Sequence, residues 1–411
     1  MKTSSPTRRS FLAGTAAVAA HVWIPKPVKG YTVHEVAAPV TPMKAGISKW
    51  DLDTPALCVD LDALEANIAK MQSSLKSGNL DSRPHAKTHK CAAIAKLQMT
   101  AGAVGICTAK LSEAEAMVAA GVDQVCMTTG NLSPNKIRRA MELRRKAGGF
   151  IQAVDFEQNA HDLSAAAKAA GVTADVVIDV AVGTRSGIPA GDGALALATL
   201  VDRLPNLNLR GMLSYDGGAQ HVNTFAARKE RALSNIEENV RTFEAMKKAG
   251  LNTGIFSGGG TGTYNIQHLV PGFTDVQVGS YVFMDMQYLA IGRADGHPVY
   301  DDFTPSLTVL GTVLNNRFPG RLTTDAGAKS LTLNMPRAGV VGEPGMEYNA
   351  GSDEFGTITF KEARKTYKMG DRIEMIVPHC DPVVNLYDYI YGIRKDVVEV
   401  VWPVTARGHS Q

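Results

Sequence analysis

Residues 149–181, GFIQAVDFEQNAHDLSAAAKAAGVTADVVIDVA, show the pattern from which the fold of this chain can be predicted. Gly149–Asp155 and Ala174–Ala181 are apolar runs of strand length, and the alanine-rich stretch Asn159–Ala170 between them has a helical pattern. Gly171 follows that stretch, at a position where glycine commonly ends a helix. Strand, helix and strand in this order predict a β-α-β unit with parallel strands.

The same alternation continues on both sides of this unit. It gives eight candidate strands: Leu80–Lys87, Ala103–Thr108, Asp123–Thr128, Gly149–Asp155, Ala174–Ala181, Leu207–Tyr215, Thr253–Ser257 and Phe273–Gly279. The clearest helical patterns between them are Ser112–Ala120, Pro134–Lys146, Asn159–Ala170 and Ala219–Ala249. Eight such repeats predict an α/β fold, a (β/α)8 TIM-type barrel. An open doubly wound sheet is the competing architecture, but it usually has fewer strands.

The regions on either side of the barrel have different patterns. Ala56–Lys76 combines a strand-like segment with an amphipathic helix ahead of the first barrel strand. Beyond about residue 295, short β-like runs broken by glycine and proline replace the helices: Thr308–Leu314, Arg321–Thr324, Gly356–Phe360, Arg372–Ile376 and Val397–Val401. We therefore expect an export signal and proline-rich lead-in (1–48), a barrel domain (49–295) and a smaller C-terminal all-β domain (296–411).

The N-terminus resembles a targeting signal. Arg8-Arg9-Ser10-Phe11-Leu12, followed by a short Ala/Val stretch, is typical of a twin-arginine signal, and Ala17-Val18-Ala19 offers a small-residue cleavage site. This route exports folded proteins, so we expect a periplasmic protein that acquires its cofactor before export. The alternative is a chance arginine pair, which would leave the protein in the cytoplasm.

The overall composition argues against several classes of protein. The chain has 411 residues, and its 43 basic and 40 acidic side chains leave a net charge of +3, which gives no electrostatic case for nucleic-acid binding. The sequence has no run of about 18 apolar residues, so we expect no membrane-spanning helix. The five cysteines are scattered without a C-x-x-C pair, which argues against a disulfide framework or a structural zinc site.

Chemically distinctive residues follow four of the predicted strands: Arg83–Lys90, Val182–Gly187, Ser214–His221 and Ser257–Thr263. Active sites of (β/α)8 barrels lie in the loops at the carboxyl ends of the strands. The loop Ser257–Thr263 can offer backbone N–H groups and hydroxyls to a phosphate-sized anion, and it matches neither nucleotide-binding glycine motif. A purely structural glycine turn is the alternative.

Lys87 lies at the end of the first predicted barrel strand. A lysine at the buried end of a strand is costly unless it has a function, and a lowered pKa would make its amine a nucleophile toward an aldehyde. Taken alone, Lys87 and Lys90 can also be surface charges. Together with an anion site on the same rim of the barrel, Lys87 favours covalent attachment of pyridoxal 5′-phosphate.

A third group of residues lies near the C-terminus, in Pro378-His379-Cys380-Asp381-Pro382. If this segment is extended, His379 and Asp381 point to the same side. One imidazole and one carboxylate, with water in the other positions, suit Mn²⁺ or Mg²⁺ better than Zn²⁺. An H-x-D triplet alone is a weak signal, and most such triplets are structural.

These motifs resemble those of a known enzyme family. The segments RPHAKTHK (83–90), GICTAKLSEAE (105–115), SGGGTGT (257–263), GSYVFMD (279–285) and PHCD (378–381) resemble D-threonine aldolases and D-serine dehydratases. Both belong to the fold-type III pyridoxal phosphate enzymes related to alanine racemase. The resemblance runs from about Trp50 to about Val401, and it implies a barrel followed by a β domain and a homodimer.

The resemblance also implies roles for individual residues. Lys87 matches the lysine that binds the cofactor, and His221 matches the histidine that faces the substrate hydroxyl. Arg185 matches the arginine that lies beside the phenolic oxygen of the cofactor in that family. The remaining residues match the cofactor pocket (Tyr215), the phosphate site (Ser257, Gly258, Gly259, Gly260 and Thr261) and the metal ligands (His379 and Asp381).

The implied reaction is retro-aldol cleavage of a small-molecule D-3-hydroxy amino acid, with D-threonine giving glycine and acetaldehyde. Related dehydratases typically have cysteine as the second metal ligand, and Asp381 in that position therefore favours an aldolase. D-serine or 3-hydroxy-D-aspartate dehydratase and 3-hydroxyaspartate aldolase are the alternatives. A racemase would need a second base, for which Tyr348 and Tyr387 are candidates. A pyridoxal phosphate carrier without turnover is disfavoured by the long β domain.

Overall fold

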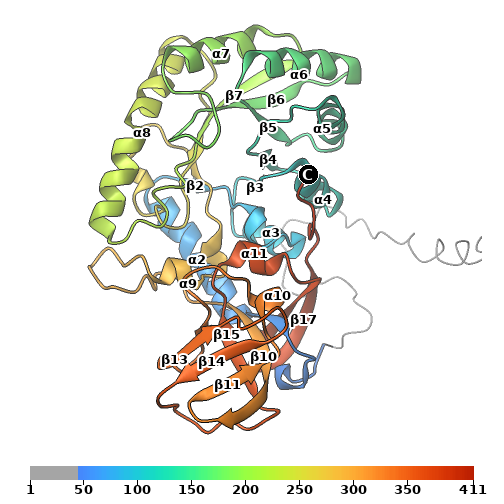
Figure 1. The fold of residues 1–411 in the computed structure, drawn as a ribbon. Helices are drawn as coiled ribbons and strands as arrows, with labels where there is room; N and C mark the ends of the chain where they lie inside the picture. The colour runs from blue at the N-terminus through green and yellow to red at the C-terminus, as the bar shows by residue number, and fades with distance from the viewer. Residues whose placement is uncertain (1–44) are drawn as a thin grey trace, which may run out of the picture.

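The computed structural model describes residues 45–411 (Figure 1). The predicted export signal and most of the proline-rich lead-in therefore lie outside the described residues. Two sheets organise the described part of the chain: an eight-stranded parallel sheet and a nine-stranded, mostly antiparallel sheet. No helix in residues 45–411 is long and apolar enough to cross a membrane.

The parallel sheet forms the barrel domain. Its strands are β2 (Asp81–Ser82), β3 (Ile106–Thr108), β4 (Val125–Met127), β5 (Ile151–Val154), β6 (Ala174–Asp179), β7 (Leu207–Ser214), β8 (Ile255–Gly258) and β9 (Asp275–Val276). Their order is β2-β9-β8-β7-β6-β5-β4-β3, and a bridge between His85 and Cys107 joins the two ends of the sheet. All eight predicted strands are present, and the predicted fold class is confirmed.

Helices alternate with these strands along the chain: α2 (Leu61–Ser77), α3 (Ala92–Thr100), α4 (Leu111–Ala119), α5 (Pro134–Lys146), α6 (Glu157–Ala170), α7 (Asp192–Arg203) and α8 (Phe225–Lys248). The helix expected from Ala219 begins later, because the side chain of Thr224 caps α8 by accepting a hydrogen bond from Ala227 N. Four short helices follow three of the barrel strands: η2 (Ala86–Thr88) follows β2, η3 (Gln267–Leu269) follows β8, and η4 (Ser280–Val282) and α9 (Met286–Leu289) follow β9.

The second sheet forms the β domain. Its strands are β1 (Ala56–Asp60), β10 (Leu307–Phe318), β11 (Arg321–Thr324), β12 (Gly339–Val340), β13 (Met346–Asn349), β14 (Gly356–Phe360), β15 (Arg372–Ile376), β16 (Tyr389–Arg394) and β17 (Val397–Pro403). The short helices η1 (Lys49–Asp51), α10 (Ala328–Leu331) and α11 (Cys380–Val384) complete the described elements. β1 precedes the barrel in sequence but pairs with β10 and β16, so the chain starts in this sheet.

One hydrophobic core runs through both domains. The same cluster of buried side chains contains Phe256 of the barrel strand β8 and Trp402 of the β-domain strand β17. α11 of the β domain contacts η2, the turn that follows barrel strand β2 (Figure 1). The β domain is therefore packed against the carboxyl end of the barrel, where the predicted site residues lie.

Candidate active site

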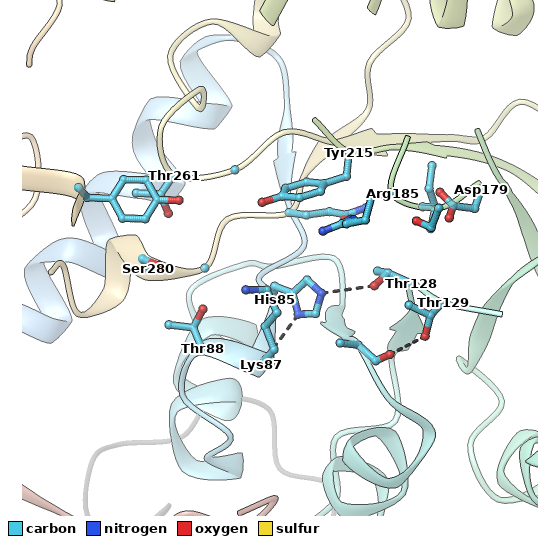
Figure 2. Close-up of a pocket in the computed structure, with 17 residues that line it drawn as sticks. His85, Lys87, Thr88, Thr128, Thr129, Asp179, Arg185, Tyr215, Thr261 and Ser280 are labelled. Atoms are coloured by element: carbon cyan, nitrogen blue, oxygen red, sulfur yellow. Dashed lines mark hydrogen bonds between the residues drawn. The ribbon is translucent and has the colours of Figure 1, made fainter. Parts of the chain in front are cut away.

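A cavity of about 280 Å³ opens at the carboxyl end of the barrel strands (Figure 2). Five of the residues singled out in the sequence line it: Lys87, Arg185, Tyr215, Gly260 and Thr261. They come from η2, the loop after β6, the end of β7 and the loop after β8. The four chemically distinctive segments therefore converge on one cavity, as expected for the active-site end of a barrel.

Lys87 lies in η2, and its amine forms an ion pair with the carboxylate of Asp381. Burial alone would lower the pKa of Lys87, but the attraction of the Asp381 carboxylate raises it above its ordinary value. The expectation of a lowered pKa was wrong for the protein without cofactor. Sequence reasoning missed the cause, because Asp381 lies 294 residues further along the chain.

The glycine-rich loop after β8 is tightly packed, and only its second half faces the cavity. A Cβ atom at Gly258 would lie 2.0 Å from the carbonyl oxygen of Ser214, and one at Gly259 would lie 2.7 Å from Gln267. Ser257 Oγ donates to Asp275 Oδ1 of the neighbouring strand β9 at 2.5 Å, and Ser257 does not line the cavity. Gly260 and Thr261 remain as the part of the loop that an anion in the cavity can reach.

The opposite wall of this end of the cavity comes from the segment after β9. Gly279 and Ser280 line the cavity, and Tyr281 N donates to Thr261 Oγ1 at 3.0 Å, which ties the two loops together. Sequence reasoning gave Gly279 and Ser280 no role. The signal was present, since phosphate sites in barrels are frequently built from the loops after both the seventh and the eighth strand.

Arg185 and Tyr215 form another wall of the cavity (Figure 2). The guanidinium carbon of Arg185 lies 4.9 Å from the ring centroid of Tyr215, within the range of a cation–π contact. Burial raises the pKa of Tyr215, although the nearby charges of Lys87 and Arg185 oppose that shift. Tyr215 is therefore a neutral aromatic wall beside a fixed positive charge.

His379 and Asp381 are not in an extended segment, contrary to the expectation from the sequence. His379 is the N-cap residue of α11, and Asp381 lies in its first turn. Although burial raises the pKa of Asp381, the Lys87 ammonium lowers it to about 2, so this carboxylate is ionised. Its Oδ1 atom is buried and has no hydrogen-bond partner among the described residues.

Asp285 orients His379. Asp285 Oδ2 lies 3.0 Å from His379 Nδ1, and the same oxygen accepts a hydrogen bond from Cys380 N at 3.0 Å. Two polar residues that follow His379 closely in the sequence bind elsewhere: Asn385 Oδ1 accepts from Gly408 N, and Asp388 pairs with Arg407. Asp285 belongs to the motif GSYVFMD, but no property of the sequence connected that motif to His379.

His221 lies next to the cavity wall and not in it. Its side chain is exposed, and its ring centroid is 4.4 Å from that of Tyr288, which lines the cavity. The two tyrosines considered as racemase bases are occupied in the β domain. Tyr348 donates to Ala326 O, Tyr387 donates to Ser330 O, and neither lines the cavity.

These residues fit the cofactor and the ion that the sequence implies, pyridoxal phosphate and a divalent metal. Gly260 and Gly279 line the cavity, and added Cβ atoms there would lie 2.7 and 2.6 Å from their neighbours, so these two glycines leave room for a phosphate close to the backbone. For a divalent ion, His379 has the carboxylate behind its ring that metal-binding histidines usually have, and Asp381 has a free oxygen. No group of three or more His, Cys, Asp or Glu side chains suited to a metal occurs in residues 45–411, so such a site has few protein ligands.

Comparison with known proteins agrees with this geometry. The family model described as the alanine racemase N-terminal domain matches residues 59–287, which contain the barrel. A second model, of a serine dehydratase domain, matches residues 306–393, which contain His379 and Asp381. The cavity therefore lies where these two domains meet.

The chain is similar to known enzymes over most of its length. It is 34% identical to a 3-hydroxy-D-aspartate aldolase of Paracoccus denitrificans, over 89% of this chain and 95% of that protein. It is also 34% identical to a D-threo-3-hydroxyaspartate dehydratase of a Delftia species, over 70% of this chain and 74% of that protein.

A solved structure gives the same result. The crystal structure of D-threonine aldolase from Filomicrobium marinum superposes with a TM-score of 0.85 at 36% identity, covering 90% of this chain and all of the other. The likeness includes the barrel and the β domain together. This chain therefore belongs to the fold-type III pyridoxal phosphate enzymes related to alanine racemase, and it is an enzyme of the D-threonine aldolase type.

Proposed function

We propose that this enzyme cleaves D-3-hydroxy amino acids by a retro-aldol reaction, converting D-threonine to glycine and acetaldehyde. The observation that carries the proposal is the ion pair between Lys87 and Asp381. It brings the proposed cofactor-binding amine into direct contact with a proposed metal ligand. A substrate attached at the position of the Lys87 amine would thus have its 3-hydroxyl beside the metal site.

The side chains have separate tasks in this proposal. Gly260 and Thr261, which line the cavity, would hold the phosphate of the cofactor, and Arg185 would hold its phenolic oxygen. When bound, pyridoxal phosphate supplies a ring that accepts the electron pair of the broken Cα–Cβ bond. His379 and Asp381 hold a divalent ion, which would lower the pKa of the 3-hydroxyl.

His221 is the proposed general base. Its exposed ring is held against Tyr288 and lies close enough to Asp285 and His379 to interact with their charges. From there the imidazole would accept the proton of the 3-hydroxyl when the Cα–Cβ bond breaks. A histidine is suited to this task because it changes charge near neutral pH.

The ligand chemistry supports Mn²⁺ or Mg²⁺ over Zn²⁺. The proposed ligands are an imidazole and a carboxylate, and hard oxygen ligands favour Mg²⁺ and Mn²⁺. Cys380 stands between them, but its thiol is fully buried and donates to the carbonyl oxygen of Met284. Burial also raises the pKa of this thiol, so a thiolate ligand is not available at this position.

An assay of products tests the proposal. Purified protein with pyridoxal phosphate and Mn²⁺ should form glycine and acetaldehyde from D-threonine and should not act on L-threonine. The similarity to a 3-hydroxy-D-aspartate aldolase favours a second substrate, 3-hydroxy-D-aspartate, which would give glycine and glyoxylate. Ammonia and a 2-oxo acid as the main products, from 3-hydroxy-D-aspartate or D-serine, would contradict the aldolase proposal and establish a dehydratase.

We further propose that the enzyme works in the periplasm as a homodimer. The twin-arginine segment at Arg8 and Arg9 supports export of the folded protein. The homodimer follows from the family alone, and sedimentation of the purified protein tests it.

A further inference from the structure

Thr88 and Asp381 each keep one buried polar atom without a partner. Thr88 is 1% exposed and lines the cavity, and its Oγ1 atom makes no hydrogen bond within residues 45–411. Asp381 Oδ1 is likewise a buried atom that makes no hydrogen bond within the described residues. Buried polar groups are nearly always hydrogen-bonded, so two unpaired atoms in one place need an explanation.

The two side chains are neighbours. Thr88 is the last residue of η2, directly after Lys87, and η2 packs against α11, which carries Asp381. The Thr88 hydroxyl lies within reach of the Asp381 carboxylate. On its other side the hydroxyl meets Gly279, where a Cβ atom would lie 2.6 Å from Oγ1. Figure 2 shows Thr88 beside Lys87 and near Ser280.

The ion pair with Lys87 occupies only one oxygen of the Asp381 carboxylate. Asp381 Oδ2 is engaged by the Lys87 amine, so Oδ1 is the oxygen that remains free to accept a hydrogen bond from the Thr88 hydroxyl. Once the amine binds a cofactor covalently, it no longer holds the carboxylate as an ammonium ion. The buried hydroxyl of Thr88 can then hold Asp381 in place.

We propose that Thr88 is a positioning residue for Asp381, and that its hydroxyl donates a hydrogen bond to this carboxylate when Lys87 carries the cofactor. The proposal rests on the proposed function, in which Asp381 is a metal ligand. Asp285 gives His379 such a partner, and Thr88 gives the second ligand a corresponding one. Loss of a partner of this kind typically weakens metal binding about 10–100-fold.

The test measures Mn²⁺ affinity of the pyridoxal phosphate-loaded protein from the electron paramagnetic resonance signal of free Mn²⁺. Thr88→Val should bind Mn²⁺ about 10–100-fold more weakly, and Thr88→Ser, which keeps the hydroxyl, should bind it nearly as tightly as wild type. The control is Thr108→Val, because Thr108 Oγ1 is also buried and unpaired but does not line the cavity. This variant should bind Mn²⁺ like wild type.

Three results would overturn the role of Thr88. The first is wild-type Mn²⁺ affinity in Thr88→Val. The second is weaker cofactor binding with unchanged Mn²⁺ affinity, which would place the hydroxyl on the phosphate. The third is a wild-type protein that binds no Mn²⁺, which overturns the metal site as well. A wild-type protein that binds Mn²⁺ but cleaves no D-3-hydroxy amino acid overturns only the proposed function.

Discussion

Asp285 and His379 are 94 residues apart in the chain, and Asp285 Oδ2 lies 3.0 Å from His379 Nδ1. Asp285 is fully buried, and its other oxygen, Oδ1, accepts a hydrogen bond from Tyr288 N at 2.9 Å. Burial would lower the pKa of His379, but the bond to Asp285 raises it above its ordinary value. One carboxylate therefore orients His379 and also caps the start of α9. Tyr288 of α9 in turn contacts the ring of His221.

Replacing Asp285 should weaken the metal site. In Asp285→Asn the charge behind the His379 ring is lost, so we expect Mn²⁺ affinity and D-threonine cleavage to fall about 10–100-fold. Metal titration and initial rates measure this effect. The control is Asp388→Asn, which removes a carboxylate near the same segment that pairs with Arg407. Equal effects of the two variants would show that Asp285 has no specific role.

Lys87 should be the attachment point of pyridoxal phosphate. Borohydride treatment of the loaded enzyme should attach the cofactor to the peptide containing Lys87. Lys90 serves as an internal comparison, because its amine is buried and lies 2.6 Å from Glu113 Oε1. Lys87→Ala should lose the visible absorption of the bound cofactor and about 10³-fold or more of the turnover. Label on Lys90, or normal turnover of Lys87→Ala, would contradict the assignment.

Local pattern predicted the strands and the strand-end segments, because both depend on residues close together in the sequence. The eight barrel strands and the approach of Lys87, Arg185 and Tyr215 to one cavity follow from that information and from the geometry of a barrel. The Lys87–Asp381 and Asp285–His379 pairs could not be predicted. They depend on how the β domain packs on the barrel, which the sequence pattern of neither domain reveals.

One local prediction was wrong. We expected His379 and Asp381 to share one side of an extended segment, but Cys380–Val384 is helical. Pro382 is tolerated near the start of this short helix, where few N–H groups have intrahelical partners. The strand expected ahead of the barrel is present as β1, but its pairing with β10 and β16 places it in the sheet of the β domain and not with residues 49–295.

Stability should fall in mild acid because of His89. This side chain is fully buried, and although its bond to Gln98 opposes the shift, burial lowers its pKa to about 4. An unfolded histidine has a pKa of about 6.5, so between about pH 6.5 and 4 the unfolded chain binds a proton that the folded chain does not. The free energy of unfolding should therefore fall with decreasing pH, by on the order of 3 kcal/mol across this range.

Urea unfolding at about pH 7 and about pH 5 measures this dependence. His89→Gln removes the titrating group, so the difference in unfolding free energy between the two pH values should be smaller in the variant than in wild type. His85 is also buried with a lowered pKa, so part of the dependence should remain. The same pH dependence in both proteins would show that His89 does not contribute.

The N-terminal segment should direct export. Fractionation of a bacterial host with a twin-arginine export system should find mature protein in the periplasm, shortened after about Ala19. The variant with Arg8→Lys and Arg9→Lys should remain in the cytoplasm at full length. Wild-type protein that stays in the cytoplasm uncleaved, in the same way as the double variant, would contradict export by this signal.

The proposed metal site should exchange its ion easily. His379 and Asp381 provide two protein ligands and no thiolate, so chelation by EDTA should remove the ion. Cleavage of D-threonine should then fall about 100-fold or more, while the visible absorption of the bound cofactor remains. Mn²⁺ should restore cleavage, and Asp381→Ala should not respond to it. Activity that survives thorough chelation would contradict a metal-dependent reaction. Recovery by Zn²⁺ alone, with ammonia released from D-serine and no cleavage of D-threonine, would show that the enzyme is a dehydratase.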